Sequence, residues 1–379
     1  MSEDLISGKR NRIYYLDVLR VIAIVSISFN HAFNRSYDTF IYSEQFIGFF
    51  AFSPEHNVFK TIIYLFSRFG VPFFLMISGA LLLRKKMDTA EDVKRFYRHN
   101  FLPLLIVTEV WLFLMYWFIV LTKPDCTILA ESGFGGALLG MVKTMLFVDQ
   151  VTLGSMWYMP MILCIYAVLP FWAMAVQRVK SPALWALPLG IVIVSGMLIP
   201  DLNGLLHLLG REDSLSFTLE YGNVFSRYLP YVFLGYFLSE GLLKNLSDGG
   251  LISVCAVGGA ALCGYQLFAF SCTYDFLVSY ESVGMLFCSV FFFELIRRKA
   301  DLLKRFQKGI TALSGMAFAI YFIHIVLIET IDWHIDMGFL SEPIAMLLLW
   351  SVSFFGSILL IRPLSKVPLF RKYLFLIKN

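Results

Sequence analysis

The stretch Ile13-Tyr-Tyr-Leu-Asp17-Val-Leu-Arg20, which continues as a mainly apolar run to His31, decides both the fold and the place of the chemistry. It is long and apolar enough to cross a membrane as a helix. Charge inside a membrane span is costly, so an ionisable residue there indicates a functional site. At roughly 100° per residue, Arg20 and His31 point within about 20° of the same direction, and Asp17 lies one turn before Arg20. The sequence therefore predicts a stripe of carboxylate, guanidinium and imidazole on one helix face.

The composition of the whole chain is that of a polytopic membrane protein. Of its 379 residues, 58% are hydrophobic and only 15% are charged, whereas soluble proteins have about 45–50% apolar and about 25% charged residues. The net charge is only +4. We find no Gly-rich phosphate loop and no metal-ligand spacing, so we expect neither a nucleic acid nor a metal ion as a ligand.

Apolar windows of about twenty residues predict ten transmembrane helices in a single domain that covers residues 1–379. They form an all-α bundle with spans near 13–33, 60–83, 101–122, 155–176, 183–200, 226–243, 250–270, 280–296, 311–331 and 344–362. The stretch 134–148 is apolar but Gly-rich and short, which favours a re-entrant or interfacial segment.

The distribution of basic residues predicts the orientation of this bundle. Twenty-three of the 31 lysines and arginines fall in the two terminal segments and in the loops after spans two, four, six and eight. By the positive-inside rule, both termini are cytoplasmic. Arg20 then lies in the cytoplasmic half of the first span, and His31 lies about 25 Å beyond Tyr14, near the outer surface. A substrate in contact with both would cross much of the bilayer.

Residue chemistry suggests roles for this stripe. Histidine titrates near neutral pH, so His31 is a candidate general base. Arg20 would bind an anionic or carbonyl group and would be held in place by Asp17. The alternative is a structural ion pair, with a histidine that meets lipid headgroups at the helix end.

Two other spans carry polar side chains at membrane depth. Arg68 precedes Pro72, which breaks the backbone ladder of the second span, and Ser78 begins a Ser-Gly pair that permits close helix contact. His324 lies in the ninth span, one turn after Tyr321. The alternatives are an arginine that extends to the interface and a histidine that only bonds between helices.

A basic segment follows the second span. Its residues Arg84, Lys85, Lys86, Arg95 and Arg98 could bind the phosphates of a nucleotide-bearing cofactor. The alternative is that this charge only sets the topology.

Six motifs stand in a fixed order along the chain: Tyr15-Leu-Asp17-Val-Leu-Arg20 with His31, Ser67-Arg68 through Ser78-Gly79, Phe96-Tyr97-Arg98 with Leu102-Pro103, a fourth-span pattern of Met156-Trp157-Tyr158 and Pro160 with Tyr166 and Pro170, Tyr228-Leu-Pro-Tyr231 with Gly235, and Tyr321 with His324. In this order they resemble the motifs of the bacterial membrane acyltransferase 3 family over essentially the whole length. The departures are modest: Ala80 stands where the family commonly has an aromatic residue, and His99-Asn100 replaces part of a usual basic run.

The resemblance implies an enzyme of the bacterial cytoplasmic membrane that transfers an acyl group, usually acetyl, from cytoplasmic acyl-CoA. The acceptor would be a hydroxyl of a cell-surface glycan or of its lipid-linked precursor. We expect catalytic roles for His31, Arg20, Asp17 and His324, and substrate contacts from Arg68, Ser78, Trp157, Tyr158 and Tyr321. Acetyl-CoA would dock near Arg84–Arg98, and polysaccharide biosynthesis machinery would be a partner.

Two points stay open at the level of the sequence. His31 either deprotonates the acceptor hydroxyl or is itself acylated. The rival functions are a transporter or glycan flippase, which would also use buried ionisable residues, and a non-catalytic scaffold in a polysaccharide assembly complex. The scaffold would tolerate loss of both His31 and Arg20, whereas the enzyme would not.

Overall fold

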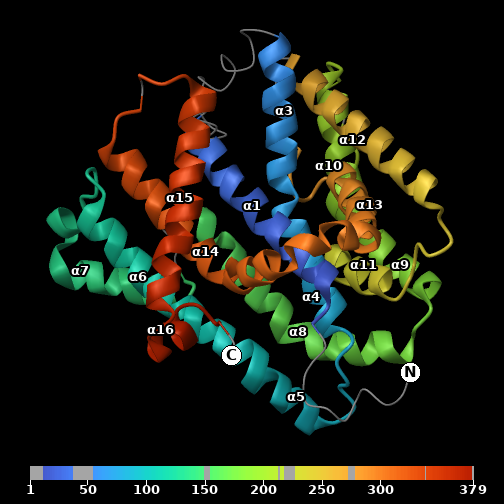
Figure 1. The fold of residues 1–379 in the computed structure, drawn as a ribbon, viewed down its shortest axis with the longest axis horizontal. Helices are drawn as coiled ribbons and strands as arrows, with labels where there is room; N and C mark the ends of the chain where they lie inside the picture. Colours follow the sequence, from blue (N-terminus) through green and yellow to red (C-terminus); the bar gives the residue numbers. More distant parts are fainter. Residues whose placement is uncertain are drawn as a thin grey trace.

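The computed structural model describes residues 12–36, 54–148, 154–211, 214–216, 227–271, 278–337 and 339–377, and this part of the chain is helical without any β-strand (Figure 1). The longer helices are α1 (Tyr14–Ser36), α3 (Pro54–Arg68), α4 (Gly70–Leu82), α6 (Leu102–Thr122), α7 (Ile128–Met145), α8 (Tyr158–Arg178), α9 (Pro182–Ile193), α10 (Ile199–Leu208), α11 (Leu229–Ser239), α12 (Asp248–Ser271), α13 (Val283–Lys299), α14 (Gln307–His334) and α15 (Glu342–Leu364). Shorter pieces are α5 (Ala90–Phe96), η1 (Tyr97–Phe101), η2 (Gly154–Trp157), η3 (Val194–Leu198), η5 (Ala300–Phe306) and α16 (Pro368–Tyr373).

The helices bear out the prediction of an all-α polytopic membrane protein. Within the described ranges, 8 helical stretches are long and apolar enough to cross a membrane. One of them, Val283–His334, runs through two predicted spans. The predicted span 226–243 contains only the 11-residue helix α11, and the predicted interfacial segment 134–148 overlaps α7. Each of the other predicted spans coincides with a helix or with a pair of consecutive helices.

The segment that we expected to be a basic loop contains a helix. Thr89 caps α5, because its hydroxyl accepts a hydrogen bond from the Asp92 backbone N–H while the Asp92 carboxylate accepts one from the Thr89 N–H. This reciprocal arrangement is a capping box. The helix then runs through the π-helical turn η1 into α6. Arg95 and Arg98 are therefore carried on an extension of the third span, whereas Arg84, Lys85 and Lys86 precede it.

Helix α1 lies in the middle of the bundle, where it packs against α14, α4, α15 and α3 (Figure 1). The second span is broken between α3 and α4, just before Pro72. The hydroxyl of Ser26 on α1 lies 2.9 Å from the carbonyl oxygens of both Phe66 and Ser67 at this break. A carbonyl that loses its helical partner at membrane depth needs such a donor, so α1 and the broken span stabilise each other.

Helices α4 and α11 approach backbone to backbone because each presents a glycine to the other. A Cβ atom added to Gly79 would lie 1.8 Å from the carbonyl oxygen of Val232, and one added to Gly235 would lie 2.1 Å from that of Met76. This is the close contact that the Ser-Gly pair predicted, with the partner glycine supplied by the Tyr228–Gly235 motif.

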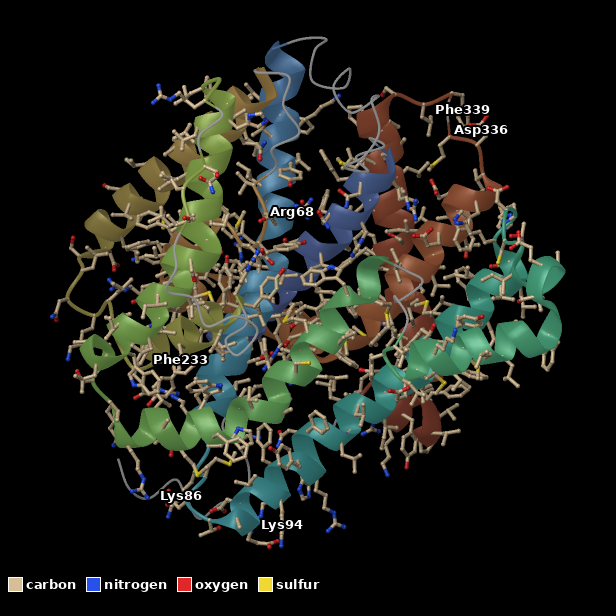
Figure 2. All side chains as sticks on the ribbon, turned by 180° about the vertical axis from the view of Figure 1, so that it is seen from behind. Arg68, Lys86, Lys94, Phe233, Asp336 and Phe339 are labelled. Atoms are coloured by element: carbon tan, nitrogen blue, oxygen red, sulfur yellow. The ribbon has the colours of Figure 1, made fainter. Side chains whose placement is uncertain are left out.

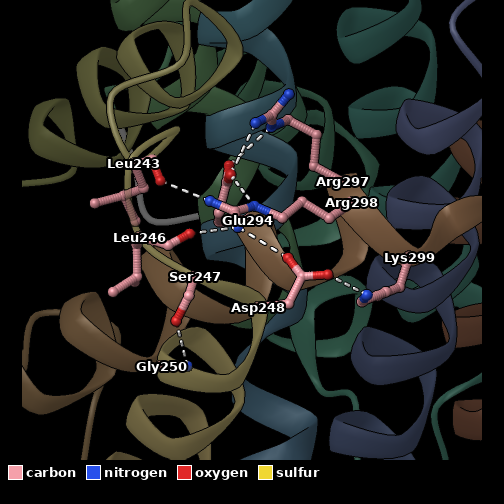
Figure 3. A network of polar contacts seen from close by, with 9 residues as sticks. All are labelled: Leu243, Leu246, Ser247, Asp248, Gly250, Glu294, Arg297, Arg298 and Lys299. Atoms are coloured by element: carbon pink, nitrogen blue, oxygen red, sulfur yellow. Dashed lines mark hydrogen bonds and ion pairs between the residues drawn. The ribbon is translucent and has the colours of Figure 1, made fainter.

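A charged network fixes the end of α13 to the segment between α11 and α12 (Figure 3). The Glu294 side chain is fully buried, and its carboxylate accepts two hydrogen bonds of 2.8 Å from Arg297 and one of 2.7 Å from Arg298. Arg298 also donates to the Leu243 and Leu246 carbonyls. Asp248 pairs with Arg298 and Lys299. The buried carboxylate therefore organises the basic end of the helix.

We expect Glu294→Gln to lower the free energy of unfolding by about 2 kcal/mol. Breaking a buried ion pair leaves uncompensated charge, although both arginines are partly exposed and can recover some hydration. Thermal unfolding of the purified protein in detergent measures the change. Asp301→Asn removes a distant, mostly exposed partner of Lys304 and should change nothing measurable. Equal stability of Glu294→Gln and the wild type would contradict this role.

Charged loops mark opposite ends of the bundle. Figure 2 shows Lys86 and Lys94 at one end, Asp336 and Phe339 toward the other, and Arg68 between them. Arg12 and Ile377, near the two ends of the described chain, line the same cavity. The two ends of the described chain therefore lie at the same end of the bundle, and the positive-inside rule predicts that this end is cytoplasmic.

Candidate functional site

The carboxylate of Asp17 collects three donors in the interior of the bundle. Arg12 Nε lies 2.5 Å from one oxygen, and Arg20 Nη1 and the Ser314 hydroxyl lie 3.1 and 2.7 Å from the other. Asp17 is only 1% exposed, so these hydrogen bonds replace the water that its charge has lost. The predicted pairing of Asp17 with Arg20 is confirmed. Arg12, which the sequence marked only as topology charge, is a second basic partner.

Arg20 lines a cavity of about 500 Å³ between α1, α4, α6, α8 and α14. Three predicted substrate residues, Ser78, Tyr158 and Tyr321, line the same cavity. Arg12, His99 and Asn100 line it as well, together with the C-terminal residues Leu376 and Ile377. We call this the Arg20 cavity. Polar side chains of four helices thus converge with an arginine that Asp17 holds in position.

The two intramembrane histidines lie together. The rings of His31 on α1 and His324 on α14 have centroids 5.3 Å apart. His324 is fully buried, and its Nδ1 lies 2.7 Å from the carbonyl oxygen of Ile320. A carbonyl only accepts, so the proton is assigned to Nδ1, and Nε2 carries a lone pair. This Nε2 has no hydrogen-bond partner among the described residues, so a basic nitrogen is available beside His31.

Arg68 is held by aromatic rings. Its guanidinium carbon lies 4.6 Å from the centre of the Tyr64 ring and 5.3 Å from that of Tyr280. Both distances suit cation–π contacts. Trp157 lies next to this group, with its ring centroid 5.7 Å from that of Tyr280. The predicted substrate residues Arg68 and Trp157 therefore form a second aromatic group, outside the lining of the Arg20 cavity.

Tyr321 connects the Arg20 cavity with the histidine pair. It lines the cavity, and its ring centroid lies 5.9 Å from that of Tyr158 and 6.4 Å from that of His324. The predicted stripe of Asp17, Arg20 and His31 is therefore divided between two places in the structure. Arg20 and His31 lie about 16 Å apart along α1 by helical rise, and His31 is not part of the cavity lining. A small chemical group therefore cannot contact Arg20 and His31 at once, whereas an extended substrate is long enough to do so.

The predicted cofactor-binding residues are not brought to one place. Arg84 and Lys86 line a separate surface cavity of about 600 Å³ together with Asp88 and Glu240, and Arg84 donates to Glu240 over 2.6 Å. Lys85 donates to Asn100 over 2.6 Å, next to the Arg20 cavity. Arg95 lies 3.9 Å from Asp92. Lys85 contacts the lining of the Arg20 cavity through Asn100, and the Arg95 carbonyl oxygen does so through His99 Nδ1 at 2.9 Å. Arg98 lines a different cavity.

A family model described as an acyltransferase domain matches residues 13–362, which is nearly the whole chain. The chain belongs to the acyltransferase 3 family. It is a multi-pass membrane acyltransferase, as the six motifs implied. No curated protein and no solved structure matches it.

In this acyltransferase, some residues of the site escaped the sequence reasoning. Arg12 precedes the first helix and Ser314 lies in a distant span, so no local spacing connects either with Asp17. Tyr166 lines the Arg20 cavity and stood in the fourth-span pattern, so that pattern could have identified it. Within the described residues, no group of three or more His, Cys, Asp or Glu side chains could hold a metal ion.

Proposed function

We propose that this acyltransferase is an O-acetyltransferase of the bacterial cytoplasmic membrane that moves the acetyl group of acetyl-CoA to a hydroxyl of an extracytoplasmic or lipid-linked polysaccharide. The observation that supports this most is the connection, through Tyr321, of an arginine-lined cavity with a pair of neighbouring histidines. Arg20 and His31 lie at different depths of one helix, as expected for two substrates that enter from opposite sides.

The donor enters the Arg20 cavity from the predicted cytoplasmic end. Arg12, His99 and Asn100 line the cavity toward that end and offer donors to polar groups of the carrier arm. Arg20 orients this arm, so that the thioester at its end lies beyond Arg20, beside His31. A preorganised guanidinium is effective in such a low-dielectric site, and Asp17 fixes its position.

The acceptor hydroxyl reaches His31 from the opposite end, and the neighbouring residues Arg68, Trp157 and Tyr280 contact the acceptor on its way. His31 takes the hydroxyl proton while the oxygen attacks the thioester carbon, and the C–S bond breaks to release the thiolate of CoA. The imidazolium returns its proton to that thiolate. His324, whose free Nε2 lies next to His31, supports the base in this step.

The test uses membranes with and without the protein. Acetyl-CoA labelled in its acetyl group is added together with the host's isolated surface glycan, and the glycan is recovered. We expect label on the glycan only where the protein is present, and release of that label as acetate by mild alkali, as for an ester. A parallel reaction with labelled succinyl-CoA tests the preference for acetyl. Equal labelling with and without the protein would refute the proposal.

A further inference from the structure

A second cavity adjoins the Arg20 cavity and has a strongly basic lining. It measures about 680 Å³, and Arg98, Arg371 and Lys372 line it together with Tyr373. No acidic side chain is part of this lining in the described structure. The surface cavity beside Arg84 differs, because Asp88 and Glu240 offset part of its positive charge. Three uncompensated cations around a cavity favour a ligand with several negative charges.

Two of these cations come from the C-terminal helix α16, which lies against α6 (Figure 1). The tail after α16 is fixed in place. The indole N–H of Trp111 donates to the Leu374 carbonyl over 2.9 Å, and Phe375 is buried at 1% exposure. The Ile377 N–H donates to the Arg371 carbonyl over 3.1 Å. α16 therefore presents its basic residues from an ordered support.

The same tail separates the two cavities. Leu376 has a φ of 48°, in the left-handed region that non-glycine residues rarely adopt, and this conformation lies where the tail turns back. Leu376, Ile377 and Pro103 line both cavities. A ligand that lies in the basic cavity can therefore pass over these three residues into the Arg20 cavity.

We infer that the basic cavity binds the phosphate groups of the acyl carrier, and that α16 belongs to the donor site through Arg371 and Lys372. This inference rests on the proposed function. A nucleotide thioester carries its phosphates at one end and its reactive acyl group at the end of a long arm. The phosphates bind among the three cations, and the arm crosses Leu376 and Pro103 toward Arg20. The volume of the cavity suits a group of nucleotide size.

The test measures binding of coenzyme A, and of pantetheine without phosphates, to the purified protein in uncharged detergent. We expect Lys372→Gln and Arg371→Gln each to raise the Kd for coenzyme A about fivefold, as for a charge-assisted contact at a partly exposed site, and to leave the Kd for pantetheine unchanged. Lys366→Gln is the matched control, because it removes an exposed charge just before α16 that does not line the cavity, and it should change neither Kd.

The outcomes separate this inference from the proposed function. A wild-type protein that binds no coenzyme A would refute the donor in the proposed function. If Lys372→Gln and Arg371→Gln both keep the wild-type Kd for coenzyme A, α16 has no donor role. That result would leave the proposed function standing. The same measurement with added vesicles of phosphatidylglycerol identifies the other source of phosphate. If the variants lose vesicle binding but keep the wild-type Kd for coenzyme A, the cavity binds lipid headgroups and the inference is wrong.

Discussion

Replacing His31 with alanine should abolish acyl transfer while the protein remains inserted and folded. Loss of a positioned general base lowers the rate by a factor of about 10²–10⁴. Labelled acetyl transfer to glycan in membranes measures the rate, and thermal unfolding in detergent measures the fold. His31→Gln removes the base but keeps a polar side chain, and it should lose activity to the same extent.

The matched control is His334→Ala, which removes an exposed histidine at the end of α14 and should leave the rate unchanged. His324→Ala tests the division of labour. If His324 supports His31, its loss lowers the rate less than loss of His31 does. Near wild-type transfer by His31→Ala would eliminate His31 as the base.

Substituting Gly79 with valine should prevent stable folding. The first added atom would lie 1.8 Å from the backbone oxygen of Val232, and backbone cannot rotate away as a flexible side chain can. Overpacking a well-packed interior typically costs about 1–3 kcal/mol, and we expect a loss of about 3 kcal/mol or more here. Size-exclusion chromatography of the solubilised protein should show little or no folded species.

Gly264→Ala is the control for this substitution. Gly264 also lies in a membrane-spanning helix, but a Cβ atom there meets nothing within 4 Å. Alanine should be neutral or slightly stabilising, because glycine is the weaker helix former by about 1 kcal/mol. A folded Gly79→Val protein with wild-type thermal stability would show that α4 and α11 do not need their close approach.

The sequence predicted best what depends on local spacing. Hydrophobic windows located the helices, and the three-residue step from Asp17 to Arg20 predicted their ion pair, because residues at that spacing are neighbours on a helix. The break before Pro72 followed from the missing N–H of proline. These features need no information about distant parts of the chain.

What the sequence could not predict depends on contacts between distant spans. His31 and His324 were separate candidates, and only the packing of α1 against α14 makes them a pair. Ser314 reaches Asp17 through the same packing. The capping box of Thr89 and Asp92 follows a local sequence pattern and could have been predicted. The segment was interpreted only by its positive charge, so the helix that begins there was missed. Tertiary contacts also decide which basic residues meet an acidic partner, as the pairing of Arg84 with Glu240 illustrates.

The break in the second span has an electrostatic consequence for Arg68. This arginine lies in the last turn of α3, and the C-terminal end of a helix carries partial negative charge. Peptide dipoles thus provide a counter-charge inside the membrane. A carboxylate at that depth would instead hold the Arg68 guanidinium in a direct ion pair. The C-terminal end of a half-helix stabilises the cation without a second charged side chain in the membrane.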